Sequence, residues 1–285
     1  MSRADRIPPT LLVLLAVSSV QFGGAFAKTL FDEAGPGGMV FLRVVFAALI
    51  LAALWRPTLA GRSGAEWRLI AAYGFTLVAM NLSFYESLDR IPLGVAVTIE
   101  FVGPLGVAIA SSRRLLDLLW ASLAAVGILL LSDFGSADLD GLGVALALLA
   151  GCFWAAYILL AVRVGRRIPG NEGLALGMAI GAVMVAPVGL ADAGSGLLSA
   201  EVLAVGLAVA ILSSAIPYTL ELEALRRLPQ GIFGVLMSLE PAAAATVGFI
   251  VLGEDLVGRE IVAIGLVVTA SAGAARSASV PPRDA

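Results

Sequence analysis

The stretch "LDRIPLGVAVTIEFVGP", residues 88–104, decides how this chain folds, because residues 225–241 repeat its pattern as "LRRLPQGIFGVLMSLEP". One offset of 137 residues, the separation of Leu88 from Leu225, matches a leucine, an arginine, two prolines and a glycine. The matched pairs are Leu88 and Leu225, Arg90 and Arg227, Pro92 and Pro229, Gly94 and Gly231, and Pro104 and Pro241. Apolar segments often look alike by chance, but proline, glycine and charged residues matched at one offset predict an internal repeat.

The composition indicates that this repeat folds in a membrane. Of the 285 residues, 60% are hydrophobic and only 14% are charged, and the mean hydropathy is +0.99. Soluble domains carry about 25% charged residues. The apolar residues fall in blocks of about 20, the length that a helix needs to cross a hydrocarbon core of about 30 Å. We therefore predict an all-α protein that crosses the membrane many times.

Charged residues and glycine- or proline-rich segments separate ten apolar blocks. The predicted transmembrane helices span residues 10–30, 37–55, 67–88, 92–111, 114–132, 141–162, 172–191, 201–224, 230–251 and 258–277. The first block is too long for a signal-peptide core and lacks a small-residue cleavage site, so we interpret it as a retained helix. The connections are short, which predicts one membrane unit with a first five-helix repeat, residues 1–135, and a second, residues 136–285.

The positive charges alternate between the two ends of the predicted helices. Fourteen arginines fall in the connections of one side, whereas only Lys28, Arg90 and Arg259 fall on the other. Cytoplasmic connections are rich in lysine and arginine, so both termini are expected in the cytoplasm. Five helices separate the two copies of the repeated stretch, and this odd number predicts that the repeats are inverted. Inverted repeats are typical of transporters that bind substrate near the midplane and alternate in access.

Ionisable residues within the predicted helices indicate where such a site lies. The candidates are Arg43, Glu100, Glu221, Glu223 and Glu240. Each costs about 2.5–3.5 kcal/mol to insert and usually faces a cavity or a partner. At the offset of 137, Glu100 aligns with Met237, and Glu240 aligns with Gly103. Residues three apart share one helix face, so each repeat is expected to direct a carboxylate along the same line.

Two prolines strengthen this prediction. A proline inside a helix lacks an N–H and clashes with the carbonyl four residues earlier. That carbonyl belongs to Glu100 for Pro104 and to Met237 for Pro241. Backbone freed at membrane depth needs protein or water to satisfy it. The sequence therefore predicts a polar central cavity that both repeats line.

The candidates also have structural interpretations. Arg43 and Glu100 can form an ion pair that only fixes the helices, and Glu223 is expected to pair with Arg227 at a helix end. Glu221 is expected to line the cavity instead. Further polar or aromatic candidates include an aligned pair, Asn81 and Tyr218, which are separated by the repeat offset; the others are Gln21, Tyr85, Trp154 and Tyr157.

What the sequence lacks excludes several classes of protein. It has no histidine and a single cysteine, Cys152, so imidazole-based metal sites, Ser-His or Cys-His catalysis and an internal disulfide framework are excluded. An intramembrane enzyme would need paired aspartates within the helices, and no aspartate falls at membrane depth. No cofactor, metal or nucleic-acid partner is expected. A passive channel is the alternative from another class.

Stretches in both halves resemble the EamA-type carriers of the drug/metabolite transporter superfamily, and within it the bacterial threonine and homoserine exporter subgroup. The matching stretches are "SSVQFGGAFAKTLF", "LR" at 42–43, "MNLSFYESL", "PLGVAVTIEFVGPLGVAIASSRR", "GCFWAAYILL", "AIPYTLELEALRRLP" and "GVLMSLEPAAAATVGFIVLGE". The residues that match polar positions of the family are Gln21, Lys28, Arg43, Asn81, Glu100, Tyr157, Tyr218, Glu221 and Glu240.

The resemblance implies a proton-dependent exporter of neutral amino acids or related metabolites in the bacterial inner membrane. Glu100 would receive the ammonium group of a zwitterion, and Arg43 or Lys28 would receive its carboxylate. A carboxylate shielded from water, Glu100 or Glu240, would exchange protons with each side, and competition between proton and substrate would give antiport. Uptake, or export of drugs, aromatic compounds or nucleosides, are the alternatives within the same fold.

Overall fold

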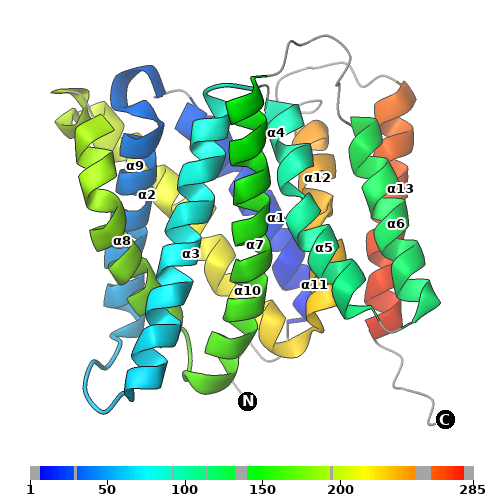
Figure 1. Cartoon of the computed structure of the whole chain (residues 1–285), viewed down its shortest axis with the longest axis horizontal. Helices are drawn as coiled ribbons and strands as arrows, with labels where there is room; N and C mark the ends of the chain where they lie inside the picture. The colour runs from blue at the N-terminus through cyan, green and yellow to red at the C-terminus, as the bar shows by residue number, and fades with distance from the viewer. Residues whose placement is uncertain are drawn as a thin grey trace.

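The computed structural model describes residues 7–28, 31–91, 93–112, 114–131, 140–192, 195–247 and 258–278. Within these ranges every regular element is helical. The longer helices stand side by side, so that the molecule forms an upright bundle (Figure 1). The chain is therefore an all-helical protein, as the composition predicts.

The first part of the chain contributes α1 (Pro9–Lys28), α2 (Phe31–Trp55), α3 (Gly64–Leu88), α4 (Leu93–Glu100), α5 (Val102–Ser111) and α6 (Leu115–Leu131). The second part contributes α7 (Gly141–Arg167), α8 (Glu172–Asp192), the 3-10 turn η2 (Ser195–Leu198), α9 (Ala200–Ala210), the π-helical turn η3 (Ile211–Ala215), α10 (Ile216–Arg227), α11 (Gln230–Met237), α12 (Leu239–Val247) and α13 (Gly258–Ala278).

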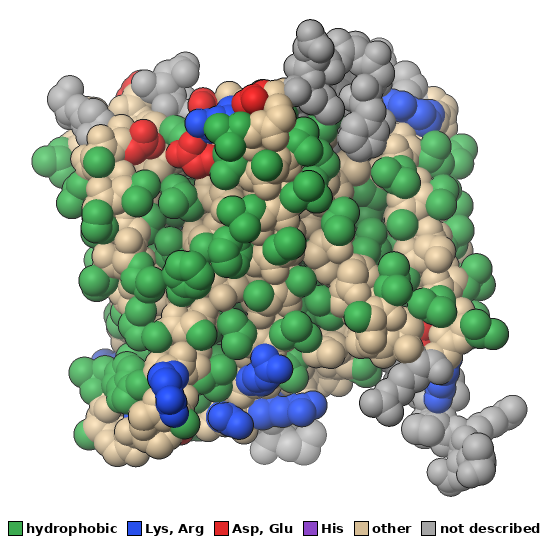
Figure 2. All heavy atoms as spheres, viewed as in Figure 1, with side chains coloured by type: hydrophobic (Ala, Val, Ile, Leu, Met, Phe, Trp, Pro, Cys, Tyr) green, Lys and Arg blue, Asp and Glu red, His purple; other side chains and the backbone are tan. Residues whose placement is uncertain are grey.

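The surface of the bundle is suited to lipid. Four helical stretches of the described residues are long and apolar enough to cross a membrane: 33–55, 141–167, 172–192 and 200–227. Shorter apolar helices are found at 9–23, 95–111, 115–130 and 261–274. Apolar side chains cover the middle of the face in Figure 2, whereas arginines gather at its lower rim and acids at its upper rim. This is the surface of a membrane-spanning protein.

Local signals at the helix ends agree with the predicted boundaries. Ser63 caps α3 by accepting a hydrogen bond from the Glu66 N–H, and the Glu66 carboxylate accepts one from the Ser63 N–H at 2.7 Å. This reciprocal capping box satisfies two amides that a helix start leaves unpaired. The Ser63 N–H, with the Ser63 hydroxyl, holds the pKa of the Glu66 carboxyl below its usual value.

Helices that are distant in the sequence approach each other closely at glycines. A methyl group on Gly74 of α3 would lie 2.3 Å from the carbonyl oxygen of Gly177 in α8. A methyl group on Gly103 of α5 would lie 2.0 Å from the carbonyl oxygen of Gly151 in α7. Small residues are the usual means by which membrane helices pack backbone to backbone. The first and second parts of the chain therefore share one interior.

Two of the predicted helices are broken near their centres. The predicted span 92–111 is α4 followed by α5, and the predicted span 230–251 begins as α11 followed by α12. α4 ends at Glu100 and α11 ends at Met237, each four residues before a proline. The linking residues, Phe101 and Ser238, have φ/ψ angles of −63°/−12° and −61°/−9°. The breaks therefore match in position and in geometry, at the sequence offset of 137.

Candidate functional site

Arg43 of α2 is the central cation of a buried polar cluster. Its side chain is largely buried, and the residue is 7% exposed. Nε donates to the Ser214 hydroxyl at 2.6 Å, and Nη2 donates to the Ser213 carbonyl oxygen. Longer hydrogen bonds run from Nη1 to the Tyr85 hydroxyl at 3.2 Å and from Nη2 to the Tyr218 hydroxyl at 3.4 Å. The guanidinium is thus held by neutral oxygens from α3, η3 and α10.

A proline explains why a backbone carbonyl is free to bind this guanidinium. Pro217 has no N–H, and the carbonyl four residues before it belongs to Ser213. The chain forms a π-helical turn over Ile211–Ala215, and the Ile216 N–H donates to the Ile211 carbonyl, five residues back. π-helical turns are frequent at functional sites because they leave such groups available. The Ser19 hydroxyl of α1 binds the neighbouring Leu212 carbonyl at 2.6 Å.

Asn81 of α3 and Tyr218 of α10 hydrogen-bond directly to each other. The Asn81 amide nitrogen donates to the Tyr218 hydroxyl at 2.9 Å and to the Leu77 carbonyl at 2.7 Å. The two residues are separated by 137 positions, which is the offset of the sequence repeat. The aligned candidates are therefore neighbours in space, and Tyr218 links Asn81 to Arg43.

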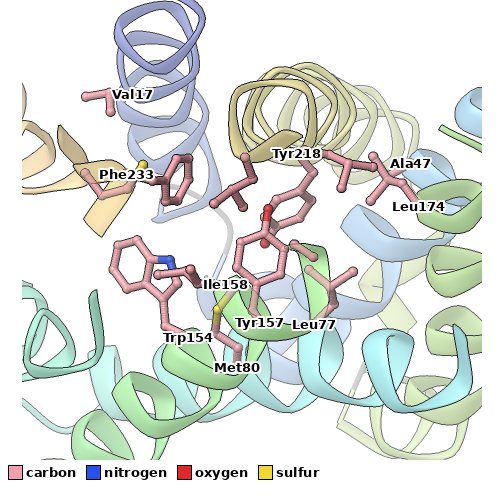
Figure 3. Packing of buried hydrophobic residues seen from close by; sticks show 14 of the residues in the cluster. Val17, Ala47, Leu77, Met80, Trp154, Tyr157, Ile158, Leu174, Tyr218 and Phe233 are labelled. Atoms are coloured by element: carbon pink, nitrogen blue, oxygen red, sulfur yellow. The ribbon is translucent and has the colours of Figure 1, made fainter. Parts of the chain in front are cut away.

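A second buried pair lies beside the first. The Tyr157 hydroxyl of α7 donates to Glu221 Oε2 of α10 at 2.9 Å. The Tyr157 ring lies 5.6 Å from that of Tyr218 and stacks on that of Tyr73 at 5.7 Å, measured between ring centroids. Tyr157 and Tyr218 lie next to each other in the buried cluster, with Trp154 and Phe233 beside them (Figure 3). All four tyrosines of the chain belong to this region.

Glu100 and Glu240 lie within electrostatic range of the same arginine. Arg43 acts on both carboxylates and on Glu221. Glu100 is 7% exposed, and Glu240 is half-buried at the start of α12. Among the described residues no ion pair joins Arg43 to Glu100, because the arginine binds hydroxyl and carbonyl oxygens instead. The structural ion pair that the sequence allows is therefore not formed in this structure.

The remaining candidates fall into separate places. Glu223 pairs with Arg227 and with Arg226 at the end of α10, as predicted for a helix-end pair. Gln21 is half-buried on α1, and no hydrogen bond joins it to the cluster in the part of the chain that the structure describes. Lys28 ends α1, and its side chain lies outside the described residues. Trp154 packs edge-on against Phe101 at the α4–α5 break, with ring centroids 4.9 Å apart.

An open cavity of about 1170 Å³ lies at the arginine-rich end of the bundle. Arginines from α7 and α10 line it together with residues of α5 and the start of α11: Arg163, Arg166, Arg226, Arg227, Ser111, Ser112, Gln230 and Gly231. Glu221 lies four residues before Leu225, which lines the cavity on α10, so it is about 6 Å along the helix axis from the cavity wall. The predicted central cavity had been expected around Glu100 and Glu240, which do not line this cavity.

Sequence reasoning missed three residues of this cluster. Ser213 and Ser214 bind Arg43. Pro217 indicates this segment in the sequence, because it leaves the Ser213 carbonyl, four residues earlier, without its helical N–H donor, as Pro104 and Pro241 do for their own carbonyls. Tyr73 stacks on Tyr157 at the edge of the cluster. The sequence held no signal for Tyr73, because a tyrosine near a helix end is usually an interfacial anchor.

Comparison with known proteins agrees with this architecture. Residues 141–275 match the EamA-like transporter family. The threonine/homoserine exporter RhtA of Salmonella typhimurium (strain SL1344) is 45% identical to this chain over 268 residues, which are 93% of this chain and 90% of that protein. The chain belongs to the EamA-like transporter family. A second RhtA exporter, from Escherichia coli (strain K12), is 44% identical over 268 residues, which are again 93% of this chain and 90% of that protein.

A solved structure extends the likeness to the whole fold. A crystal structure of a protein that is 19% identical superposes on this chain with a TM-score of 0.80 and covers 95% of it. At this identity the match concerns the fold alone. The relatives of the EamA-like family are transporters rather than enzymes, so the buried Arg43 cluster is a candidate transport site rather than a catalytic one.

Proposed function

We propose that this protein exports threonine, homoserine or closely related neutral amino acids across the bacterial inner membrane. The observation that carries the proposal is the identity of 44–45% to RhtA exporters over 93% of the chain. Threonine and homoserine are zwitterions with a short hydroxylated side chain. The cluster around Arg43 offers one cation, three carboxylic acids and several hydroxyl groups, which are chemically suited to such a molecule.

The proposal includes ten transmembrane helices arranged as two inverted repeats, residues 1–135 and 136–285. The matching breaks after Glu100 and Met237 support the repeat. So does the hydrogen bond between Asn81 and Tyr218, since only residues close to a pseudo-two-fold axis can contact their own equivalents. The arginines at one rim support cytoplasmic termini, because cytoplasmic connections are rich in positive charge.

A substrate carboxylate would bind Arg43 by replacing the hydroxyl groups that the arginine holds most weakly. Its contacts with Tyr85 and Tyr218 are the longest of the four, at 3.2 and 3.4 Å. A substrate carboxylate could replace these hydroxyls while the Ser213 and Ser214 contacts still hold the arginine. Glu100 would then receive the ammonium group. A carboxylate–guanidinium pair is stronger than the neutral contacts that it displaces, which would favour the exchange.

Proton coupling would follow from the imbalance of charge. Among the described side chains, Arg43 is the cation that acts on Glu100, Glu221 and Glu240, and Glu100 and Glu221 both act on Glu240. Three ionised acids would leave two negative charges uncompensated in a poorly solvated site, which like-charge repulsion opposes. A proton and the substrate ammonium group would therefore compete for the cluster. Such competition, combined with alternating access, would give antiport.

Transport by purified protein in liposomes tests the proposal. Preloaded vesicles are expected to accumulate labelled threonine or homoserine by counterflow, and an imposed proton gradient is expected to drive net movement. Glu100→Gln should uncouple movement from the proton gradient. Absence of counterflow with threonine, homoserine and other neutral amino acids would exclude the proposed substrate class. Equal transport by Glu100→Gln with and without a gradient would exclude competition at Glu100.

A further inference from the structure

The hydroxyl of Tyr73 is a buried polar group without a partner. Tyr73 lies on α3, and its side chain is completely buried. The hydroxyl has no hydrogen-bond partner among the described residues. The Tyr157 ring is stacked on the Tyr73 ring, but the two hydroxyls do not meet the distance and angle of a hydrogen bond. A buried hydroxyl without a partner is costly, so its presence needs a physical reason.

Packing alone gives no such reason. The Tyr73 ring stacks on Tyr157, and it lies over Gly177 of α8, where a methyl group would come within 2.9 Å of the ring. A phenylalanine ring would make both contacts and would leave no unpaired hydroxyl. The unpaired group is therefore the feature that separates tyrosine from phenylalanine at this position.

An acceptor for this hydroxyl lies nearby. Glu221 accepts a hydrogen bond from Tyr157 at 2.9 Å, and the Tyr157 ring stacks on the Tyr73 ring with the centroids 5.7 Å apart. Oε2 of Glu221 accepts from Tyr157, and no other hydrogen bond to the Glu221 side chain is found within the described ranges. A carboxylate has room for several donors, so Glu221 can accept a second hydroxyl.

The helices that carry Tyr73, Tyr157 and Glu221 indicate when this second hydrogen bond would form. Tyr157 and Glu221 lie on α7 and α10, which belong to the second predicted repeat, whereas Tyr73 lies on α3 of the first. Movement of one repeat against the other would leave the Tyr157–Glu221 bond intact but would change the distance from Tyr73 to Glu221. Glu221 is also near the arginine-lined cavity, on the side from which protons would be exchanged.

We propose that Tyr73 is a positioning residue whose hydroxyl donates to Glu221 in another state of the transport cycle and so links the two repeats. This inference rests on the proposed function, because it assumes that the two repeats move during transport. The bond is absent from the state described above and forms when α3 moves relative to α7 and α10. Tyr73 thus stabilises one state through Glu221 without contacting the substrate.

Transport kinetics provide the first test. Tyr73→Phe, measured in the full-length protein in liposomes with labelled homoserine, is expected to lower the maximal rate about tenfold and to change KM less than about twofold. Its Tm should not fall, because the variant loses only an unpaired hydroxyl. Ser87→Ala is the matched control, since Ser87 also lies on α3 and carries a buried hydroxyl without a described partner. The control should transport at the wild-type rate.

Infrared spectroscopy provides a second test that needs no substrate. The carbonyl band of neutral Glu221, identified by its loss in Glu221→Gln, is recorded in wild type, Tyr157→Phe and the double variant Tyr73→Phe/Tyr157→Phe. The spectra are recorded at several pH values so that both states are populated. In Tyr157→Phe a part of the band should keep the frequency of a hydrogen-bonded acid, because Tyr73 donates to Glu221 in the molecules that have reached the other state. In the double variant the whole band should lie at the frequency of an acid without a hydrogen bond. If wild-type protein moved no amino acid, the proposed function would fail while this test of Tyr73 stayed decisive.

Two results would overturn the inference. One is a wild-type maximal rate in Tyr73→Phe, which would mean that the hydroxyl is idle or is satisfied by a water molecule. The other is a Glu221 band in Tyr157→Phe that has shifted as far as in the double variant, which would mean that Tyr73 does not reach Glu221.

Discussion

The helix α3 and the segment α9–η3–α10 align at the offset of 137 residues but differ in backbone. The offset of 137 relates Asn81 in α3 to Tyr218 in α10. α3 is one continuous helix from Gly64 to Leu88, whereas its counterpart contains the π-helical turn Ile211–Ala215. Met80 stands where the second copy has Pro217. The missing N–H of that proline accounts for the difference.

The two aligned segments contribute different chemical groups to the site. The continuous copy keeps its carbonyls within the helix and contributes side chains, namely Asn81, Tyr85 and Tyr73. The interrupted copy contributes a backbone carbonyl, that of Ser213, which binds Arg43. By contrast, the breaks after Glu100 and Met237 are alike in both copies. Segments that align at the offset of 137 residues therefore contribute to the Arg43 cluster in different ways.

The largest expected effect concerns Arg43, which the interrupted copy holds. Arg43→Gln should lower transport about 100-fold or more, because it removes a buried cation that acts on three acids, together with several charged hydrogen bonds. The measurement is counterflow in liposomes. Arg56→Gln, at the exposed end of the same helix, is the matched control and should transport normally. If Arg43→Gln kept more than about a tenth of the wild-type transport rate, Arg43 would not be part of the transport site.

A second change would make the two copies alike. Pro217→Ala restores the N–H, so the Ser213 carbonyl is expected to return to the helix and Arg43 to lose an acceptor. Transport should fall about tenfold, while Tm should stay the same or rise because the helix gains a hydrogen bond. Pro187→Ala is the control, since Pro187 lies inside α8 but is exposed and outside the cluster. Unchanged transport in Pro217→Ala would show that the π-helical turn is dispensable.

A smaller effect is expected at the contact between the two copies. Asn81→Ala and Tyr218→Phe should show a coupling free energy of about 1 kcal/mol in a double-mutant cycle, measured as unfolding of the protein in detergent. Asn171→Ala combined with Tyr218→Phe should be additive, since Asn171 lies in the turn before α8. Additive effects in the first cycle would mean that the hydrogen bond between repeat equivalents contributes nothing to stability.

The smallest effect concerns the start of α3. Glu66→Gln should lower Tm slightly at neutral pH, because the Ser63 N–H and hydroxyl then lose a charged acceptor. These contacts lower the pKa of Glu66 in the folded protein, so the stabilisation is present above the usual carboxyl range and disappears as the pH falls through the lowered pKa. Thermal melting at several pH values measures this. Glu201→Gln, in the first turn of α9, is the control. A difference in Tm that persists at low pH would contradict the capping role.

Much of the arrangement can be predicted from the sequence, because a small number of local rules governs where membrane helices form and where they break. The apolar blocks predicted an all-helical chain with helices of membrane length, and the offset of 137 predicted that Glu100 and Met237, where α4 and α11 end, occupy matching positions. The prolines predicted which carbonyls are freed, but they did not predict the breaks at Phe101 and Ser238. The helix-end pair of Glu223 and Arg227 was predicted because residues four apart share a helix face.

The partners of the candidates were harder to predict, because they depend on how helices from distant parts of the sequence pack. Arg43 was a candidate, but its acceptors lie about 170 residues away, on a turn that interrupts a predicted helix. The ion pair with Glu100, which charge alone allows, is replaced by contacts with hydroxyl and carbonyl oxygens. Tyr73 gave no signal, since a lone tyrosine in a helix has the same local pattern whether it packs, anchors or positions.

The sequence alone predicts a helical, membrane-spanning chain, an offset of 137 residues that relates residues 88–104 to 225–241, and the positions where a proline lacks an N–H. It does so because apolar length, charge and the missing N–H of proline act locally. The packing of the helices sets the other contacts: Arg43 binds the carbonyl freed by Pro217, and Asn81 bonds to Tyr218. It also leaves the Tyr73 hydroxyl without a hydrogen-bond partner among the described residues. These contacts depend on the approach of distant helices, which glycines such as Gly74 and Gly103 permit but do not specify.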